Sequence, residues 1–266
     1  MNKVPEEHRF IDFSDYARPV AVKIALLLKS SPVRAIHLTL LYFFIGVMAA
    51  YLIYSGKFLP AGVLVMVKNI LDAADGSLAR LQNRPSRVGR FADSIADIVL
   101  NFLFILAIAL HYRCCYLTAF AAFLSISIQG SFFNYYYVLY RHRVGGDTTS
   151  KVDERPEGYP WDDPRALRIL YFLYVLFYRW QDRLVEWFDR KIVASPPIHS
   201  DRIFLSIVTL FGLGIHLLIL SITLILGVPL MSFPIFIAMG ILMPVFIAVY
   251  GRVKGRREPP GNSVED

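Results

Sequence analysis

The sequence predicts an all-α integral membrane protein with six transmembrane helices, an N-terminal interfacial amphipathic helix and both termini in the cytoplasm. Apolar residues make up 56% of the 266 residues and charged residues only 18%, against about 25% charged residues in soluble proteins. The net charge is +7, but the basic residues recur at intervals between apolar runs. This distribution is typical of cytoplasmic loops and argues against a nucleic-acid-binding face.

Six stretches are long enough to cross a hydrocarbon core of about 30 Å, which needs roughly 20 helical residues. They are expected near residues 35–55, 59–80, 90–110, 114–139, 203–227 and 229–250. Basic residues are abundant in alternate connections, whereas the first and third loops contain only Lys57 and Arg113. Because Lys and Arg are retained on the cytoplasmic side, this alternation predicts that both termini face the cytoplasm.

Two helices are expected outside the six spans. Residues 10–30 form an amphipathic pattern that favours a helix in the membrane interface. Residues 141–202 form a long cytoplasmic insert, in which 166–191 predicts a second interfacial or bundle-packing helix because its uncharged run is too short to span. The chain thus divides into an interfacial segment (1–34), a membrane domain with the insert (35–250) and a basic cytoplasmic tail (251–266).

Four aspartates are expected to meet where the second and third spans enter the cytoplasm. Asp72 and Asp75 share one face of the second span, and Asp93 and Asp97 share one face of the third. An acid inside a membrane helix costs about 2.5–3.5 kcal/mol on insertion scales, so such a group needs a partner. Hard oxygen ligands favour Mg²⁺ or Mn²⁺, and two such ions side by side serve displacement at phosphorus.

Small residues and one arginine accompany the acids. Gly76, Ala79 and Gly89 let a bulky ligand approach the backbone closely, and Arg80 offers a guanidinium fork for phosphate. A structural alternative is that the acids form interfacial ion pairs with the arginines of the connecting loop. Four acids on two facing helices favour the cation site.

These residues together resemble the signature of the CDP-alcohol phosphotransferase (CDP-alcohol phosphatidyltransferase) family. The match consists of Asp72-x2-Asp75-Gly76-x2-Ala79-Arg80-x8-Gly89-x3-Asp93-x3-Asp97. The resemblance implies a transfer of a phosphoalcohol group from a CDP-alcohol to an acceptor hydroxyl with release of CMP. It also implies a role in phospholipid biosynthesis and an active site that faces the cytoplasm. A homodimer is compatible with the resemblance.

The resemblance assigns roles within the motif. Asp72, Asp75 and Asp93 would hold two divalent cations on the donor diphosphate, and Asp97 would share in metal binding and act as the base. The cytidine nucleotide would be surrounded by Gly76, Ala79, Arg80 and Gly89.

The substrates stay open at this point. A lipid on at least one side of the reaction is expected, because the site opens at the inner leaflet. CDP-diacylglycerol, the donor of a phosphatidyl group, is favoured. The stretch after the fourth span, SFFNYYYVLYRHRVGG, differs from the Ser-Tyr-x-Arg-Ala-Arg-like stretch of members that act on inositol phosphate or glycerol phosphate. A CDP-linked headgroup donor with a diacylglycerol acceptor, or a soluble polyol phosphate acceptor, remains as an alternative. A membrane prenyltransferase and a cation transporter are the rivals outside this chemistry.

Three basic residues are weaker candidates for phosphate or acceptor contacts. Lys68 lies four residues before Asp72, which favours a counter-ion to the acids over a substrate contact. Arg141 and Arg143 end the fourth span, where topology alone already predicts basic residues.

Overall fold

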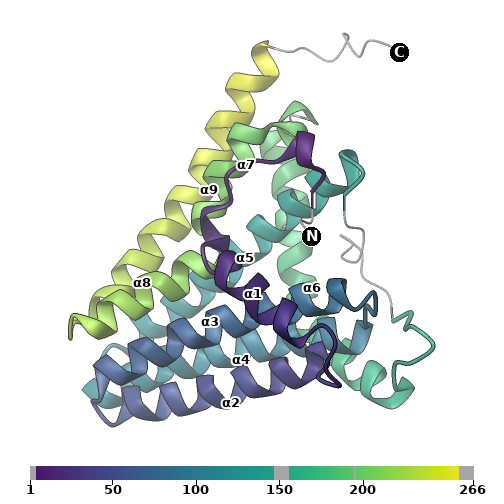
Figure 1. Ribbon diagram of the computed structural model, residues 1–266. Coiled ribbons are helices and arrows are strands. Elements are labelled where there is room, and N and C mark those ends of the chain that lie inside the picture. The colour runs from purple at the N-terminus through teal and green to yellow at the C-terminus, as the bar shows by residue number, and fades with distance from the viewer. Residues whose placement is uncertain (1–3, 147–155, 195, 258–266) are drawn as a thin grey trace.

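The computed structural model describes residues 4–146, 156–194 and 196–257, and every regular element in this part of the chain is helical. This confirms the all-α fold. The long helices α2, α3 and α4 lie side by side, and α9 extends away from them toward the C-terminus (Figure 1). The helices are α1 (Arg18–Leu28), α2 (Ala35–Tyr54), α3 (Phe58–Leu81), α4 (Arg87–Tyr112), α5 (Tyr116–Arg143), α6 (Pro164–Phe188), α7 (Arg202–Val208), α8 (Leu213–Ile225) and α9 (Ser232–Arg257).

Five helical stretches of the described chain are long and apolar enough to cross a membrane, and each corresponds to an expected span. They are Ala35–Tyr54, Arg87–Tyr112, Tyr116–Arg143, Arg202–Ile225 and Pro229–Arg256. The remaining expected span is α3, which has 24 residues but carries the charges of the acidic motif. Helix α3 packs against α1, α2 and α8, and its charged residues Lys68 and Asp75 are buried.

The N-terminal segment is less helical than the sequence predicts. Helix α1 starts at Arg18 rather than near residue 10, and a 3₁₀ turn, Phe13–Asp15, precedes it. Asp12 caps this turn by accepting a hydrogen bond from the Ser14 amide (3.1 Å). Pro19 lies in the first turn of α1, where its missing N–H is tolerated.

The expected fifth span is interrupted near the same segment. Helices α7 and α8 are separated by a 3₁₀ turn, Thr209–Phe211, and by Gly212 in an extended conformation. At the start of α8, a Cβ on Gly214 would lie 1.8 Å from the Ser14 carbonyl oxygen. A glycine is required at this position because the N-terminal segment lies directly on the helix.

The insert contributes α6, close to the expected 166–191 helix, and α6 packs on α4 and α5. Its end is fixed by Asp189, which accepts hydrogen bonds from Tyr136 (2.9 Å) and His199 (3.0 Å). Burial alone would raise the pKa of Asp189, but these hydrogen bonds outweigh it and hold the pKa below its ordinary value. Residues 147–155 and 195 of the predicted insert, residues 1–3 of the predicted interfacial segment and residues 258–266 of the predicted tail lie outside the described residues.

Candidate functional site

The site is built on the hairpin of α3 and α4, whose short connection is fixed from two sides. Ser86 caps α4 by accepting a hydrogen bond from the Gly89 amide (2.9 Å). The Ser86 hydroxyl in turn donates to Asp162 (2.6 Å), and the Arg87 amide donates to the same carboxylate (2.9 Å). The insert therefore orders the loop between the two motif-bearing helices.

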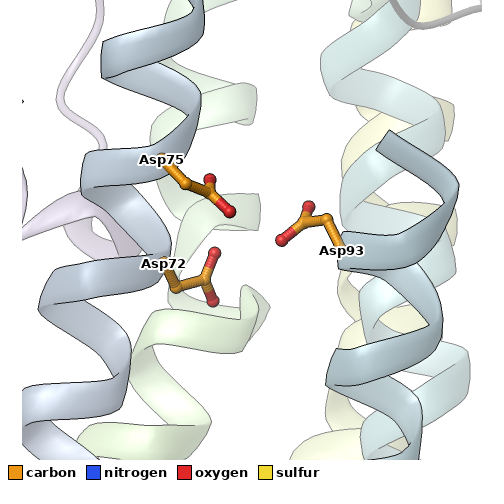
Figure 2. Close-up of side chains that lie close together, drawn as sticks. All are labelled: Asp72, Asp75 and Asp93. Atoms are coloured by element: carbon orange, nitrogen blue, oxygen red, sulfur yellow. The ribbon is translucent and has the colours of Figure 1, made fainter. Parts of the chain in front are cut away.

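Three of the four predicted aspartates form one cluster. Asp72 and Asp75 extend from α3 toward Asp93 on α4, and the three carboxylates point toward one another (Figure 2). One carboxylate oxygen from each lies within 4.8 Å of the other two. The spacing that placed the acids on one face of each helix thus brings together side chains from two helices.

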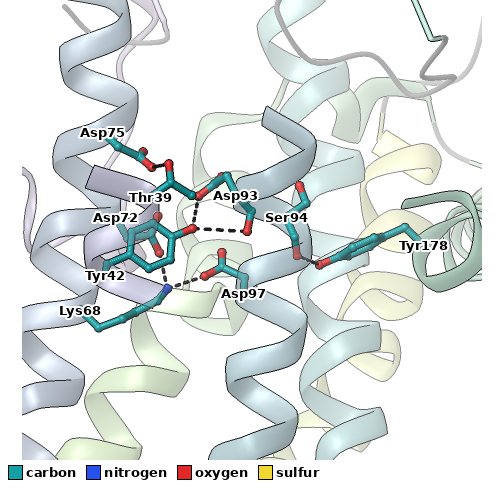
Figure 3. Close-up of polar contacts among 9 residues, drawn as sticks. All are labelled: Thr39, Tyr42, Lys68, Asp72, Asp75, Asp93, Ser94, Asp97 and Tyr178. Carbon is teal, nitrogen blue, oxygen red and sulfur yellow. Dashed lines mark hydrogen bonds and ion pairs between the residues drawn. The ribbon is translucent and has the colours of Figure 1, made fainter. Parts of the chain in front are cut away.

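Two hydroxyl groups from α2 hold this cluster, and neither was predicted from the sequence. Thr39 donates a hydrogen bond to Asp75 (2.7 Å), and Tyr42 donates one to Asp93 (2.7 Å) (Figure 3). Both side chains lie in an otherwise apolar helix and are buried. A pair of hydroxyls three residues apart was the available signal, because such a pair occupies one helical face.

Lys68 links the fourth aspartate to the cluster. Its ammonium group forms an ion pair with Asp72 (2.5 Å) and another with Asp97, and it lies 4.7 Å from the centre of the Tyr42 ring. The Lys68 side chain is 1% exposed. Asp97 therefore stands beside the cluster of Asp72, Asp75 and Asp93 and contacts a cation of the protein itself (Figure 3).

The donor set of this cluster fits a hard divalent cation. Mg²⁺ and Mn²⁺ prefer carboxylate oxygens, and Asp72, Asp75 and Asp93 offer three of them in close proximity. Three carboxylates so close together repel one another unless positive charge lies between them. Lys68 supplies one positive charge for Asp72 and Asp97, so the cluster retains excess negative charge for a bound cation.

A cavity of about 370 Å³, the donor cavity, opens beside the cluster. Asp75 and Asp93 line it together with every residue predicted to surround the nucleotide, namely Gly76, Ala79, Arg80 and Gly89. The loop and the start of α4 add the guanidinium groups of Arg84, Arg87 and Arg90. From the sequence these arginines were predicted only as ion-pair partners of the acids. Tyr159 of the insert also lines the cavity. This arrangement suits a diphosphate, because arginine forks bind phosphate oxygens in pairs.

The two arginines at the end of α5 have different positions. Arg141 lines the donor cavity, is 2% exposed and stacks over the Tyr137 ring at 4.8 Å. Arg143 lies outside the lining of this cavity, and its guanidinium contacts Nδ1 of His199 (3.3 Å). The structure thus brings Arg141, but not Arg143, to the predicted phosphate site.

A second cavity, the cation cavity, has a volume of about 210 Å³ and is lined by all four aspartates. Asp12, Asp15 and Arg18 of the N-terminal segment also line it. The N-terminal segment that lies on Gly214 therefore forms part of the wall of the cation cavity.

Replacing Lys68 by Met is expected to destabilise the protein in chelator and to increase the stabilisation that Mg²⁺ provides. Removing one member of a buried ion pair costs about 3–5 kcal/mol, because the other charge stays buried and uncompensated. A bound divalent cation would offset part of this cost. The measurement is the thermal unfolding temperature in detergent, in EDTA and in excess Mg²⁺.

The matched control for Lys68→Met is Lys57→Met, which changes an exposed lysine immediately before α3. Equal unfolding temperatures of Lys68→Met and the unmodified protein in EDTA would show that the ion pairs contribute nothing. If Mg²⁺ raised the unfolding temperature of Lys68→Met and of the unmodified protein by the same amount, Lys68 and the cation would not be neutralising the same carboxylates.

Comparison with known proteins agrees with the family that the motif resembles. The model of the CDP-alcohol phosphatidyltransferase family matches residues 33–189. A bifunctional IPC transferase and DIPP synthase of Aquifex aeolicus is 37% identical over 79 residues, which are 29% of this chain and 18% of the relative. An archaetidylinositol phosphate synthase of Pyrococcus horikoshii is 36% identical over 74 residues, which are 28% of this chain and 39% of the relative.

A third similarity concerns a relative with a different named substrate. A CDP-diacylglycerol–serine O-phosphatidyltransferase of Helicobacter pylori is 43% identical over 56 residues, which are 21% of this chain and 24% of the relative. The matches to these three relatives therefore span well under half of each relative's length. The names of these relatives mention different molecules, so the similarity does not select one acceptor.

Proposed function

Because the chain belongs to the CDP-alcohol phosphatidyltransferase family, we propose that it transfers a phosphatidyl group from CDP-diacylglycerol to an alcohol and releases CMP. The observation that carries this proposal is the cluster of Asp72, Asp75 and Asp93 at the edge of an arginine-lined cavity. Carboxylates that can hold a cation then lie next to guanidinium groups that can hold a diphosphate. Members of the family use divalent metals, in agreement with this donor set.

The donor cavity is proposed to hold the cytidine nucleotide and its diphosphate. Gly76 and Gly89 leave room at the backbone of α3 and α4, and the guanidinium of Arg80 lies beside Gly76. The arginines orient the diphosphate and compensate its charge. Ordering of the α3–α4 loop by Asp162 keeps these groups in place before the donor arrives.

The three clustered aspartates and Asp97 are proposed to serve two divalent cations, Mg²⁺ or Mn²⁺. Such ions neutralise the charge on the attacking and leaving oxygens of a displacement at phosphorus. Thr39 and Tyr42 orient the carboxylates of Asp75 and Asp93 through their hydrogen bonds. This support resembles the second layer of hydrogen bonds that fixes metal ligands in other proteins.

Asp97 is proposed to act as the base. As the new bond between the acceptor oxygen and the β-phosphorus forms, the bond from that phosphorus to the CMP oxygen breaks. The acceptor's proton goes to the Asp97 carboxylate, and CMP leaves with the electron pair of the broken bond. Lys68 contacts Oδ1 of Asp97 and so holds the carboxylate in a fixed orientation.

We propose six membrane spans. Five are the apolar helical stretches, and the sixth is α3. Both termini and the active site are proposed to face the cytoplasm, since the basic residues gather in alternate connections. The packing of α3 against α1, α2 and α8 supports a position inside the bundle. A homodimer stays a prediction.

Labelling of single cysteines is expected to reach position 57 from outside the cell but not position 157. Lys57 lies in the turn between α2 and α3, and Glu157 lies in the insert; both are exposed. The variants Lys57→Cys and Glu157→Cys should be made with Cys114 and Cys115 replaced by Ser, because both cysteines lie in the α4–α5 turn. Labelling of position 157 in intact cells would contradict the proposed orientation.

A panel of donors tests the proposed function directly. The purified protein in vesicles receives CDP-diacylglycerol or a CDP-linked headgroup, each with a set of alcohols, and CMP is measured. We expect acceptor-dependent CMP release from CDP-diacylglycerol. Release from a CDP-linked headgroup with diacylglycerol alone would instead establish the alternative direction of transfer, and no release from any donor would refute the proposal.

A further inference from the structure

A third cavity, the α6 cavity, also has Asp97 in its lining. It has a volume of about 210 Å³ and is lined by α4, α5, α6 and the start of α8. Asp97 lines both the cation cavity and the α6 cavity, and Arg90 lines both the donor cavity and the α6 cavity. A molecule in the α6 cavity would therefore lie next to the group proposed to accept the proton.

The insert helix α6 forms one wall of this cavity and is fastened to its neighbours. The Tyr178 hydroxyl donates a hydrogen bond to the Ser94 carbonyl of α4 (2.8 Å), close to Asp97 (Figure 3). Ser131 of α5 donates to the Gln181 side chain (3.0 Å). Tyr174 packs on Phe91 with ring centres 5.0 Å apart. These contacts tie α6 to both α4 and α5, so the wall is part of the fold.

The lining offers groups that recognise hydroxyls. Asn101 follows Asp97 by one helical turn on α4, and Asn134 faces the same cavity from α5. Neither amide has a hydrogen bond to another side chain within the described ranges. An amide both donates and accepts hydrogen bonds, so it pairs well with an alcohol group.

The charge of the lining argues against a phosphorylated ligand. Arg90 is the only arginine or lysine among the described residues that line the α6 cavity, and the carboxylates of Asp97 and Asp182 also face it. The donor cavity, by contrast, is lined by Arg80, Arg84 and three further arginines. Phosphate recognition needs several cationic donors, and a phosphate group here would meet two carboxylates.

We infer that the α6 cavity binds the acceptor and that this acceptor is a small alcohol without a phosphate group, either a polyol or an amino alcohol. The inference rests on the proposed function and adds the class of acceptor. The cavity volume is below the roughly 300–1,000 Å³ of sites for drug-sized ligands, which suits a molecule of this size. The acceptor hydroxyl gives its proton to Asp97 as its oxygen bonds to phosphorus and CMP departs.

Matched pairs of acceptors test the class. The full-length protein in vesicles that contain CDP-diacylglycerol and Mg²⁺ receives glycerol or glycerol 3-phosphate, and myo-inositol or myo-inositol 1-phosphate. Serine and ethanolamine represent the amino alcohols. We expect an unphosphorylated alcohol to give a kcat/KM for CMP release at least tenfold above that of either phosphate. A preference for a phosphorylated member, or release only with diacylglycerol and a CDP-linked headgroup, would overturn the inference while leaving the transferase activity intact.

Two variants test the location. Asn101→Leu and Asn134→Leu each remove an amide that is proposed to bind the acceptor, so the acceptor KM should rise about fivefold, the effect of one lost hydrogen bond. The KM for CDP-diacylglycerol should not change. The control is Phe120→Leu on the exposed face of α5. Unchanged acceptor KM values in both asparagine variants, or parallel changes in both substrates, would overturn the assignment of this cavity.

Failure of the inference can be told apart from failure of the proposed function. If no donor and acceptor together release CMP, both are refuted. If CMP is released but the asparagine variants behave like Phe120→Leu, only the acceptor cavity is refuted.

Discussion

Asp93→Asn is expected to lower CMP release by more than about 100-fold. Loss of a residue that only hydrogen-bonds to a metal ligand costs at most about 100-fold, and loss of a ligand itself should cost more. Asp93 is the member of the three-carboxylate cluster that α4 contributes, so its replacement leaves Asp97, which pairs with Lys68, as the acid that α4 offers to the cations. Asn keeps the shape of the side chain but removes its negative charge. Affinity for Mn²⁺ should fall together with turnover, and the same result is expected for Asp72→Asn and Asp75→Asn.

The control for these variants is Glu186→Gln, which removes the charge of an acid on α6 that pairs with Arg190 (2.6 Å). Exposed ion pairs contribute little, so this variant should keep normal activity. Near-normal turnover of Asp93→Asn, with unchanged Mn²⁺ affinity, would show that the cluster does not hold the cation.

Asp97→Asn is expected to lower kcat by about 10²–10⁴-fold, the usual contribution of a general base. Asn can still accept a hydrogen bond from Lys68, but it cannot take a proton from the acceptor hydroxyl. Because Asp97 lies beside the three-carboxylate cluster rather than within it, donor binding should suffer less than in Asp72→Asn.

Calorimetry with the CDP-linked donor, performed on the same preparations as the CMP assay, separates the two roles. Loss of turnover with retained donor affinity is the expected pattern for Asp97→Asn. If the four aspartate variants lose donor affinity equally, Asp97 is primarily a metal ligand and the base is another group. If Asp97→Asn keeps near-normal turnover, the base assignment is wrong.

Much of the site could be predicted because its residues follow local rules. The spacing of Asp72, Asp75, Asp93 and Asp97 decides which helical face each occupies, and a short loop decides that the two faces meet. The positions of Gly76, Ala79, Arg80 and Gly89 in one cavity follow from the same hairpin. Apolar length was sufficient to locate the five apolar helical stretches of the described chain.

The contacts that complete the site could not be predicted, because they join segments distant in sequence. The hydrogen bond from Thr39 to Asp75 spans 36 positions, and the one from Tyr178 to Ser94 spans 84. Helical periodicity shows which residues share a face but not which helix that face meets. The interruption of the fifth expected span likewise lies beside the contact between Ser14 and Gly214, which no local pattern indicates.

The described chain has five apolar stretches long enough to cross a membrane, one fewer than the six proposed spans, and the difference has a physical reason. Helix α3 carries Lys68, Asp72 and Asp75, and these charges lower its hydropathy. Their mutual contacts, and the contacts with α2 and α4, remove much of the cost of placing them in a membrane helix. The same charged residues of α3 thus form part of the candidate site and lower the hydropathy of the helix.

The proposed role of the acidic cluster in holding a cation is tested by the metal dependence of CMP release. The purified protein in vesicles of CDP-diacylglycerol is assayed with its acceptor in EDTA, and again after addition of excess Mg²⁺ or Mn²⁺. CMP release should disappear in EDTA and return with either ion, because Asp72, Asp75 and Asp93 offer only hard oxygen ligands. Undiminished release in EDTA would contradict it.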